Sequence, residues 1–193
     1  MPNQPRLWVV RHGETEWSRS GQYTGLTDMP LTPDGEAQSR VVGQKLANFG
    51  IEFNLVLTSP LGRARSTAEL AGFAGAEVVR EAHEWDYGDY EGIESNEIRR
   101  RTPSYVIWDD GVPNGELLDD VAARADAVIE RVRTELDDDG HALLFTHGHF
   151  SRVVAARWLG LPADRGRHFV LGTAQVSRLG WDKKTPVIEA WGL

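Results

Sequence analysis

Three short apolar segments of this chain each run into cationic or imidazole side chains. The segments and the residues that follow them are 7–10 with Arg11 and His12, 55–58 with Arg63, and 143–146 with His147. Apolar runs of this length, bounded by glycine or proline, are typical of buried strands. In an open α/β sheet the carboxyl ends of parallel strands meet at one edge, and ligands bind outside that edge. We therefore expect these four side chains to lie close together.

Strand-like and helix-like patterns alternate along the chain. The sequence predicts helices at 33–48, 61–71, 116–136 and 149–159, a short helix near 93–101, and added edge strands at 175–179 and 186–190. Such alternation favours an α/β fold with three layers, in which a doubly wound, mainly parallel sheet carries helices on both faces. Residues 83–115 are rich in aromatic and acidic side chains, and we expect them to form an excursion above the sheet. We expect one domain over residues 1–193.

The helix predicted at 33–48 has the clearest boundaries. Thr32 is a favourable N-cap residue, and Pro33 suits the first helical position. Gly50 follows the last turn, where glycine commonly ends a helix. We expect the buried face to consist of Ala37, Val41, Leu46 and Ala47.

The composition limits the class of partner. The 193 residues include 21 Lys and Arg against 29 Asp and Glu, a net charge of −8, with no basic stripe, so nucleic acid is not an expected partner. No apolar run reaches 18 residues, which argues against a membrane span. The chain contains no cysteine, which removes disulfides, thiolate catalysis and cysteine-bound zinc, and fits a reducing compartment. We expect a cytoplasmic protein without an exported leader, and a homodimer on general frequency.

The four clustered side chains have the chemistry that phosphoryl transfer requires. A neutral imidazole at His12 is nucleophilic near pH 7 and forms a covalent phosphoramidate, provided that an acceptor such as a backbone carbonyl holds its other ring nitrogen. Arg11 and Arg63 can each bind phosphate oxygens in a fork. His147 can donate a hydrogen bond to the transferring group, and we expect it to do so as an imidazolium. The expected ligand is a small phosphorylated metabolite, with no metal or other cofactor.

The proton for the leaving oxygen is expected from the segment 83–92. Four carboxylates lie there, and Glu84 follows the strand predicted at 77–80 most closely. A glutamate beside Trp85 and bound phosphate is suited to carry a proton as the general acid. A protonated Glu84 and a neutral His12 together predict a bell-shaped activity profile on the acidic side of neutral.

The ordered set of motifs resembles the histidine phosphatase superfamily, with its cofactor-dependent phosphoglycerate mutase-like fold. The matching blocks are Arg11 to Ser18 continuing through 23–32, Thr58 to Ala68, Glu84 to Gly92, 114–116 with Arg124, and Thr146 to Gly148. The resemblance implies a phosphohistidine at His12, a proton donor at Glu84, and a phosphate pocket completed by Arg11, Arg63 and His147. It also implies substrate contacts at Ser18, Thr24 and Gly25.

Two positions depart from the family pattern, and a third agrees with one branch of the family. Ser18 stands where many members have Asn, and Leu117 stands where many have Ser, so the hydrogen bonding at both positions is expected to differ. His149 follows the second histidine by two residues, as in the branch that includes sedoheptulose bisphosphatase-like proteins. Its position at a helix start fits either substrate contact or a capping role.

Several activities remain open from sequence. The segment between Glu84 and His147 is short compared with that of the mutases, which favours a phosphomonoesterase, with sugar phosphates as candidate substrates. A phosphoglycerate mutase would use the same intermediate. The His147-Gly148-His149 spacing would also suit a metallohydrolase, although no HExxH motif accompanies it. A protein that binds phosphate without turnover is the last alternative, because some relatives of such enzymes have lost catalytic residues.

Overall fold

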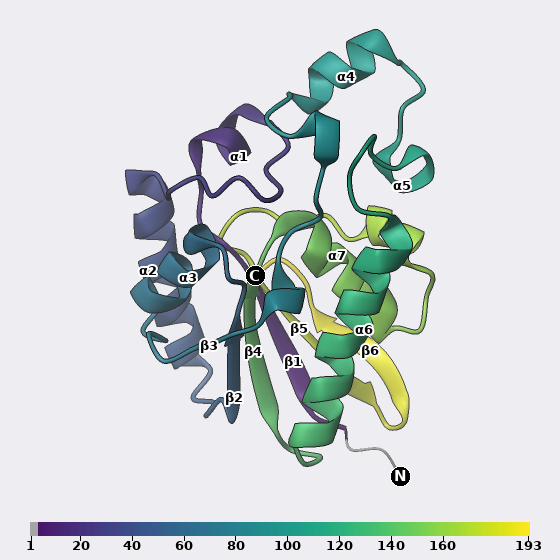
Figure 1. Ribbon diagram of the computed structural model, residues 1–193. Coiled ribbons are helices and arrows are strands. Elements are labelled where there is room, and N and C mark those ends of the chain that lie inside the picture. The colour runs from purple at the N-terminus through teal and green to yellow at the C-terminus, as the bar shows by residue number, and fades with distance from the viewer. Residues whose placement is uncertain (1–3) are drawn as a thin grey trace.

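The computed structural model describes residues 4–193, which form a mixed six-stranded sheet covered by helices (Figure 1). The strands are β1 (Arg6–Arg11), β2 (Leu55–Thr58), β3 (Glu77–Val78), β4 (His141–Thr146), β5 (Val176–Asp182) and β6 (Thr185–Ala190), in the spatial order β3-β2-β4-β1-β5-β6. The first four strands are parallel, and the last two are added antiparallel at one edge. The predicted α/β class and mainly parallel sheet are therefore confirmed. Residues 1–3 of the predicted domain lie outside the described residues.

Helices cover both faces of the sheet, as the sequence predicts. The long helices are α2 (Pro33–Asn48), α3 (Gly62–Leu70), α6 (Leu118–Glu135) and α7 (Gly148–Trp158). In Figure 1, α2 and α3 lie on one side of the strands, and α6 and α7 lie on the other. The predicted and observed bounds agree within two residues.

The central strand β1 shows why its sequence is a continuous apolar run. Leu7 and Val9 belong to a core shared with α6 and α7, whereas Trp8 and Val10 belong to a second core shared with α2 and α3. All four side chains are fully buried. Successive strand residues point to opposite faces, so a parallel strand covered on both faces must be apolar at every position.

The predicted buried face of α2 is wrong at three of its four positions. Ala37, Val41 and Ala47 are exposed, and the buried residues of the helix are Gly35, Ser39, Val42 and Leu46. These follow the spacing of about 3.6 residues per turn more closely than the predicted set does. Two of them are small because α2 approaches the loop after β1: a Cβ on Gly13 would lie 2.4 Å from the Gly35 carbonyl oxygen.

A cap of short elements lies above the carboxyl ends of the parallel strands (Figure 1). It contains α1 (Glu16–Ser20), the 3₁₀ turns η1 (Arg80–Ala82) and η2 (Gly88–Tyr90), α4 (Ser95–Arg101) and α5 (Ile107–Asp110), and a further 3₁₀ helix, η3 (Ala163–His168), follows α7. Of these elements, the sequence predicts only α4. The others are too short to produce a periodic pattern, so their geometry depends on tertiary contacts.

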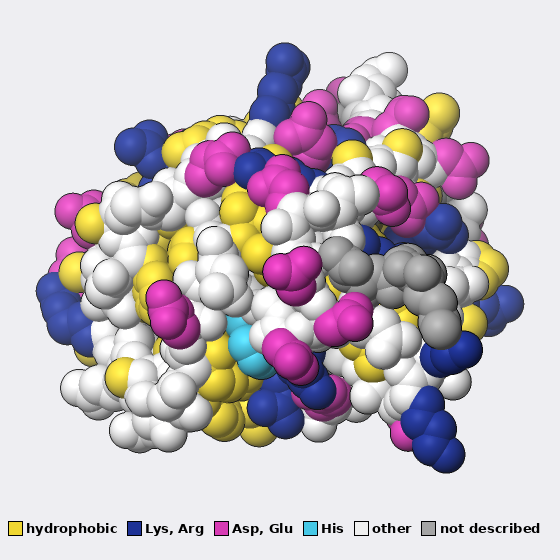
Figure 2. Space-filling model, turned by 90° about the horizontal axis from the view of Figure 1, so that it is seen from below, with side chains coloured by type: hydrophobic (Ala, Val, Ile, Leu, Met, Phe, Trp, Pro, Cys, Tyr) yellow, Lys and Arg dark blue, Asp and Glu magenta, His cyan; other side chains and the backbone are white. Residues whose placement is uncertain are grey.

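The end of the molecule opposite the cap has a surface of mixed charge. Figure 2 views this lower face, where acidic and basic side chains lie interspersed among apolar ones. Within residues 4–193, no helix has both the length and the apolar character that crossing a bilayer requires.

Candidate active site

The ends of β1 and β4 bring the two predicted catalytic histidines together. Arg11 pairs with Thr146 across the two strands, and the His12 amide donates to the Thr146 carbonyl oxygen at 2.9 Å. The ring centroids of His12 and His147 are 5.2 Å apart. The register of neighbouring parallel strands therefore places both imidazoles at one point on the sheet edge, as the sequence predicts.

The ring of His12 is fixed in one orientation. Its Nδ1 lies 2.7 Å from the Gly13 carbonyl oxygen, which can only accept, so Nδ1 carries the proton and Nε2 keeps its lone pair. Burial, followed by the neighbouring Arg63 and Arg11, lowers the pKa of His12 well below its ordinary value of 6.5. The side chain is therefore a neutral imidazole whose Nε2 is available as a nucleophile.

Arg63 holds the loop that follows α1. Its side chain donates to the carbonyl oxygens of Thr24 at 3.1 Å, Gly25 at 2.8 Å and Thr27 at 2.8 Å, and its Nε donates to Nδ1 of His147 at 3.2 Å. Only 1% of this residue is exposed. The guanidinium is thus occupied mainly by protein acceptors, and it lies behind the cavity lining rather than on it.

His147 has the opposite tautomer to His12. Because the Nε of arginine always carries a hydrogen, Nδ1 of His147 must accept, and its Nε2–H donates to the Ser59 hydroxyl at 2.7 Å. Burial, followed by Arg63 and His12, lowers the pKa of His147 well below its ordinary value. These contacts favour a neutral imidazole, whereas the imidazolium expected from the sequence depends on the charge of a bound phosphate dianion.

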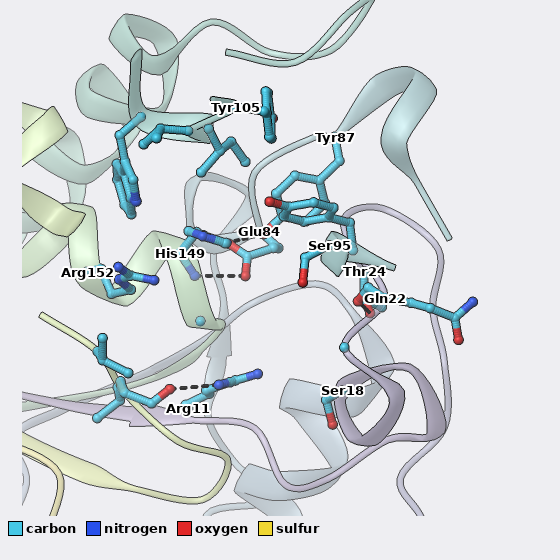
Figure 3. A pocket seen from close by; sticks show the side chains of 18 of the residues that line it. Arg11, Ser18, Gln22, Thr24, Glu84, Tyr87, Ser95, Tyr105, His149 and Arg152 are labelled. Carbon is cyan, nitrogen blue, oxygen red and sulfur yellow. Dashed lines mark hydrogen bonds between the residues drawn. The ribbon is translucent and has the colours of Figure 1, made fainter. Parts of the chain in front are cut away.

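Arg11 extends from the end of β1 into the cavity (Figure 3). Its Nη1 donates to the Leu171 carbonyl oxygen at 2.6 Å, while its buried Nε has no partner among the described residues. A Cβ on Gly148 would lie 3.3 Å from this Nε, so glycine lets the guanidinium rest against the start of α7. Arg11 is therefore a half-buried cation whose buried Nε lies beside the cavity with an unused hydrogen-bond donor.

Glu84 occupies the N-terminus of α7. Its carboxylate accepts from the backbone amides of Trp85 at 2.9 Å, His149 at 3.0 Å and Phe150 at 2.8 Å. Three backbone donors at a helix N-terminus stabilise a carboxylate. Arg11 and Arg63 also interact electrostatically with this group. The carboxylate of Glu84 is therefore held at the start of α7, where it lines the cavity.

The turn that resembles the family's supporting block holds Glu84 in place. Arg124 forms a two-bond ion pair with Glu116 at 2.7 Å for both bonds, and it donates to the His83 carbonyl oxygen at 2.9 Å. The indole of Trp85 donates to the Glu116 carbonyl oxygen at 2.8 Å. Both neighbours of Glu84 are therefore bound to this turn. Leu117 follows it, 70% exposed, and α6 begins there without a side-chain cap.

A cavity of about 420 Å³ opens between the sheet edge and the cap (Figure 3). The lining side chains include the predicted Arg11, His12, Ser18, Thr24, Glu84 and His149, and also Gln22, Tyr23, Tyr87, Ser95, Arg99, Tyr105, Trp108 and Arg152. Of the second group, the sequence indicates only Trp108, a loop tryptophan expected to line the mouth of the site. Arg152 was within reach of sequence reasoning, because it lies one helical turn after His149 on α7 and therefore on the same face.

The three substrate contacts implied by the resemblance have different surroundings. The Ser18 hydroxyl donates to the Thr15 carbonyl oxygen and accepts from the Thr15 amide, both at 2.9 Å, in a capping box at the start of α1. The Thr24 hydroxyl donates to the Gln22 carbonyl oxygen at 3.1 Å. Gly25 is not on the lining: its amide donates to Glu91 at 2.9 Å, and its carbonyl oxygen holds Arg63.

Comparisons with known proteins agree with this arrangement. Residues 7–193 match the family described as the histidine phosphatase superfamily (branch 1). An acid phosphatase of Mycobacterium tuberculosis is 38% identical over 97% of this chain and 92% of its own, and the sedoheptulose 1,7-bisphosphatase of Saccharomyces cerevisiae is 38% identical over 83% and 70%. A solved open-reading-frame product of Mycobacterium tuberculosis superposes with a TM-score of 0.93 at 38% identity, covering 98% of this chain and 97% of its own.

Within the described residues 4–193, no group of three or more His, Cys, Asp or Glu side chains is arranged to hold a metal ion. The paired imidazoles of opposite tautomer, the two arginines beside them and the carboxylate at the start of α7 coincide with a family match over almost the whole chain. This protein belongs to branch 1 of the histidine phosphatase superfamily and is a phosphatase.

Proposed function

We propose that this phosphatase hydrolyses small phosphate monoesters through a phosphohistidine formed on His12. The observation that carries the proposal is the hydrogen bond from His12 Nδ1 to the Gly13 carbonyl oxygen, together with the lowered pKa of the ring. These features present Nε2 as an unprotonated nucleophile. In the first step Nε2 attacks phosphorus, the N–P bond forms, and the ester P–O bond breaks.

Charge stabilisation comes from the two arginines. Arg11 has an unpartnered Nε beside the cavity, the Arg63 guanidinium lies behind the cavity lining, and the neutral His147 ring lies 5.2 Å from the ring of His12. These groups are fixed before substrate arrives, so they need little reorganisation as charge develops on the phosphoryl oxygens. A fork of arginine donors also orients the phosphoryl group for in-line attack.

Glu84 transfers the proton in both steps. Its carboxylate accepts hydrogen bonds from three backbone amides, which stabilise the form without a proton. We therefore infer that the proton needed for the first step arrives with a monoanionic phosphate or from solvent. Glu84 then gives this proton to the leaving oxygen. In the second step water attacks phosphorus, the N–P bond breaks, and Glu84 removes the proton from the attacking water.

The cavity dimensions favour a small organic group. A volume of about 420 Å³ accommodates a phosphorylated metabolite of sugar size. The sedoheptulose 1,7-bisphosphatase name of one relative points to the same chemical class. We therefore propose sugar phosphates as substrates. A mutase would return the phosphoryl group to a bound organic acid instead of water. The relatives with phosphatase names are 38% identical to this chain and those named probable phosphoglycerate mutase are 30–32% identical, which favours hydrolysis.

The proposal is tested by phosphate release in the presence of EDTA. Wild-type protein should release phosphate from several sugar phosphates and from p-nitrophenyl phosphate, and His12→Ala should lose at least about 10³-fold in kcat. His168→Ala is the matched control, because that histidine is exposed in η3 and away from the cavity lining. Equal activity in His12→Ala, inactivation by EDTA, or conversion of 3-phosphoglycerate to its 2-isomer without phosphate release would contradict the proposal.

A further inference from the structure

One pair of cavity side chains is not used in the chemistry described above. The Tyr87 hydroxyl lies 2.6 Å from Nδ1 of His149, a residue in the first turn of α7 (Figure 3). Tyr87 follows Glu84 by three residues and is 2% exposed. The two residues are 62 positions apart in the chain, so the fold brings them together.

The burial of Tyr87 decides the direction of this hydrogen bond. His149 Nδ1 is the only hydrogen-bond partner of the Tyr87 hydroxyl among the described residues. If Nδ1–H donated to the hydroxyl oxygen, the phenolic proton would be buried without an acceptor, which is costly. Burial also raises the pKa of Tyr87 well above its ordinary value, so the phenol keeps its proton. Tyr87 therefore donates, and the hydrogen of His149 is on Nε2.

This Nε2–H is available to a ligand. His149 lines the cavity, and its Nε2 has no partner within residues 4–193. Aromatic rings hold the imidazole plane, with centroid distances of 5.3 Å to Trp108, 6.0 Å to Trp85 and 6.1 Å to Tyr23. The donor therefore has a fixed direction.

The charge of the donor is also defined. Burial, followed by Arg152 and Arg11, lowers the pKa of His149 well below its ordinary value. His149 is therefore a neutral donor, which suits a hydroxyl oxygen. The same cavity is lined by the uncharged polar side chains of Gln22, Thr24 and Ser95, and also by the cations Arg99 and Arg152, which suit a negatively charged group.

We propose that Tyr87 fixes His149 as an Nε2–H donor to a hydroxyl oxygen of the substrate's organic group, so that the cavity selects polyol phosphates over alkyl phosphates without hydroxyls. The inference rests on the proposed phosphatase function. In this scheme His149 binds substrate, and Tyr87 is a positioning residue that acts through His149.

The tautomer is tested first, without any activity. Protein labelled with ¹⁵N-histidine should show the Nε2–H tautomer for His149 and the Nδ1–H tautomer for His12 in long-range ¹H–¹⁵N spectra near neutral pH. Tyr87→Phe should convert His149 to a mixture of tautomers. Tyr90→Phe is the matched control, since it removes a hydroxyl three residues away that is not on the cavity lining. An Nδ1–H tautomer for His149 in the wild type would overturn the inference.

Selectivity is tested with two substrates of similar leaving group, a hexose 6-phosphate and n-butyl phosphate. The ratio of their kcat/KM values should fall about ten-fold in Tyr87→Phe and in His149→Ala, mainly through KM for the hexose phosphate. His149→Gln should recover part of the ratio, because its amide nitrogen is a donor near the position of Nε2. Tyr90→Phe should keep the wild-type ratio.

The outcomes separate this inference from the proposed function. If wild-type protein hydrolyses both esters and His12→Ala does not, the phosphatase proposal holds. If the ratio then stays constant in both Tyr87→Phe and His149→Ala, the inference is wrong. If His149→Ala fails to fold, circular dichroism will show it, and the comparison of His149→Gln with Tyr87→Phe still decides the matter, since both keep a side chain of similar size.

Discussion

The active site has two parts that are built in different ways. The floor, which we define as His12 on the cavity lining with Arg63 and His147 behind the lining, is 3%, 1% and 0% exposed. The wall, defined as Tyr87, Tyr105, Trp108, His149 and Arg152, comes from the cap and from α7 and meets the open cavity. Most hydrogen-bonding groups of the floor bind other floor residues or backbone carbonyl oxygens. In the wall, the Nε2–H of His149 has no protein partner among the described residues.

This difference separates chemistry from selectivity. A floor fixed by parallel-strand register presents the same nucleophile to any phosphate, because every group in it is held before substrate binds. A wall made of aromatic planes and one oriented donor contacts the organic group instead. We therefore expect floor substitutions to reduce activity on all substrates, and wall substitutions to change the ratio between substrates.

The largest effect is expected from Arg63→Lys in the floor. Lysine cannot reproduce the contacts to the carbonyls of Thr24, Gly25 and Thr27 together with His147, and it leaves several buried acceptors unpaired. We expect kcat/KM to fall by about 10² or more on every substrate, and the free energy of unfolding to fall by about 3 kcal/mol. Urea unfolding and phosphate release measure the two effects.

Arg65→Lys is the matched control for this prediction, since Arg65 is two positions further along α3 and exposed. Arg65→Lys should change neither kcat/KM nor the free energy of unfolding measurably. A wild-type kcat/KM in Arg63→Lys would show that the floor tolerates a point charge in place of the guanidinium.

The next effect is expected from Glu84→Gln, which tests the junction of floor and wall. The amide group would place N–H donors against one of the backbone amides that now donate to the carboxylate, and it cannot transfer a proton. We expect about a 10²-fold loss of kcat on alkyl phosphates. The loss should be smaller on p-nitrophenyl phosphate, whose leaving group needs less protonation. Equal losses on both substrates would contradict the role of Glu84 as the acid.

A moderate effect is expected in the pH profile. The pKa of His12 is lowered well below 6.5 by burial and by Arg63 and Arg11. Since the neutral ring is the nucleophile, and it predominates above this lowered pKa, the acid limb of kcat/KM should lie below pH 6.5. Initial rates from pH 4.5 to 8 measure it. If the acid limb of kcat/KM reaches half its maximum at or above pH 6.5, the surroundings of His12 do not lower its pKa, and the prediction is wrong.

Tryptophan fluorescence is the necessary control for the pH profile. His12, His147 and His149 have lowered pKa values, so the unfolded chain binds protons more readily than the folded protein does. Stability should therefore be full above pH 6.5 and should decrease as pH falls below it, by up to about 1.4 kcal/mol per pH unit for each histidine. Rates are compared only at pH values where the fluorescence remains native.

The residues of the floor, and His149 and Trp108 of the wall, could be predicted from sequence, and the contacts that hold them could not. Arg11, His12 and His147 directly follow apolar runs, and the register of parallel strands then determines that they meet. The partners of Arg63 are backbone carbonyls of the loop after α1, whose shape no local pattern encodes. The contact between Tyr87 and His149 joins a 3₁₀ segment to a helix start, so it depends on the whole cap. The lowered pKa of His147 could not be predicted either, because it follows from burial and from the neighbouring Arg63 and His12.

The smallest effect is expected at the link between the two regions. The Glu91 carboxylate, in the cap, accepts from the amides of Gly25 at 2.9 Å and Thr27 at 3.0 Å, and the carbonyls of these two residues hold Arg63. Glu91→Gln keeps one acceptor oxygen but loses the charge, so we expect a loss of about 1 kcal/mol in stability and a few-fold decrease in kcat/KM on all substrates. Glu97→Gln, which removes only a surface pair with Arg101, should cost less. If Glu91→Gln changes the ratio between a hexose phosphate and n-butyl phosphate instead, the cap and the floor do not act as separate parts, because a contact that positions Arg63 would then also position the wall.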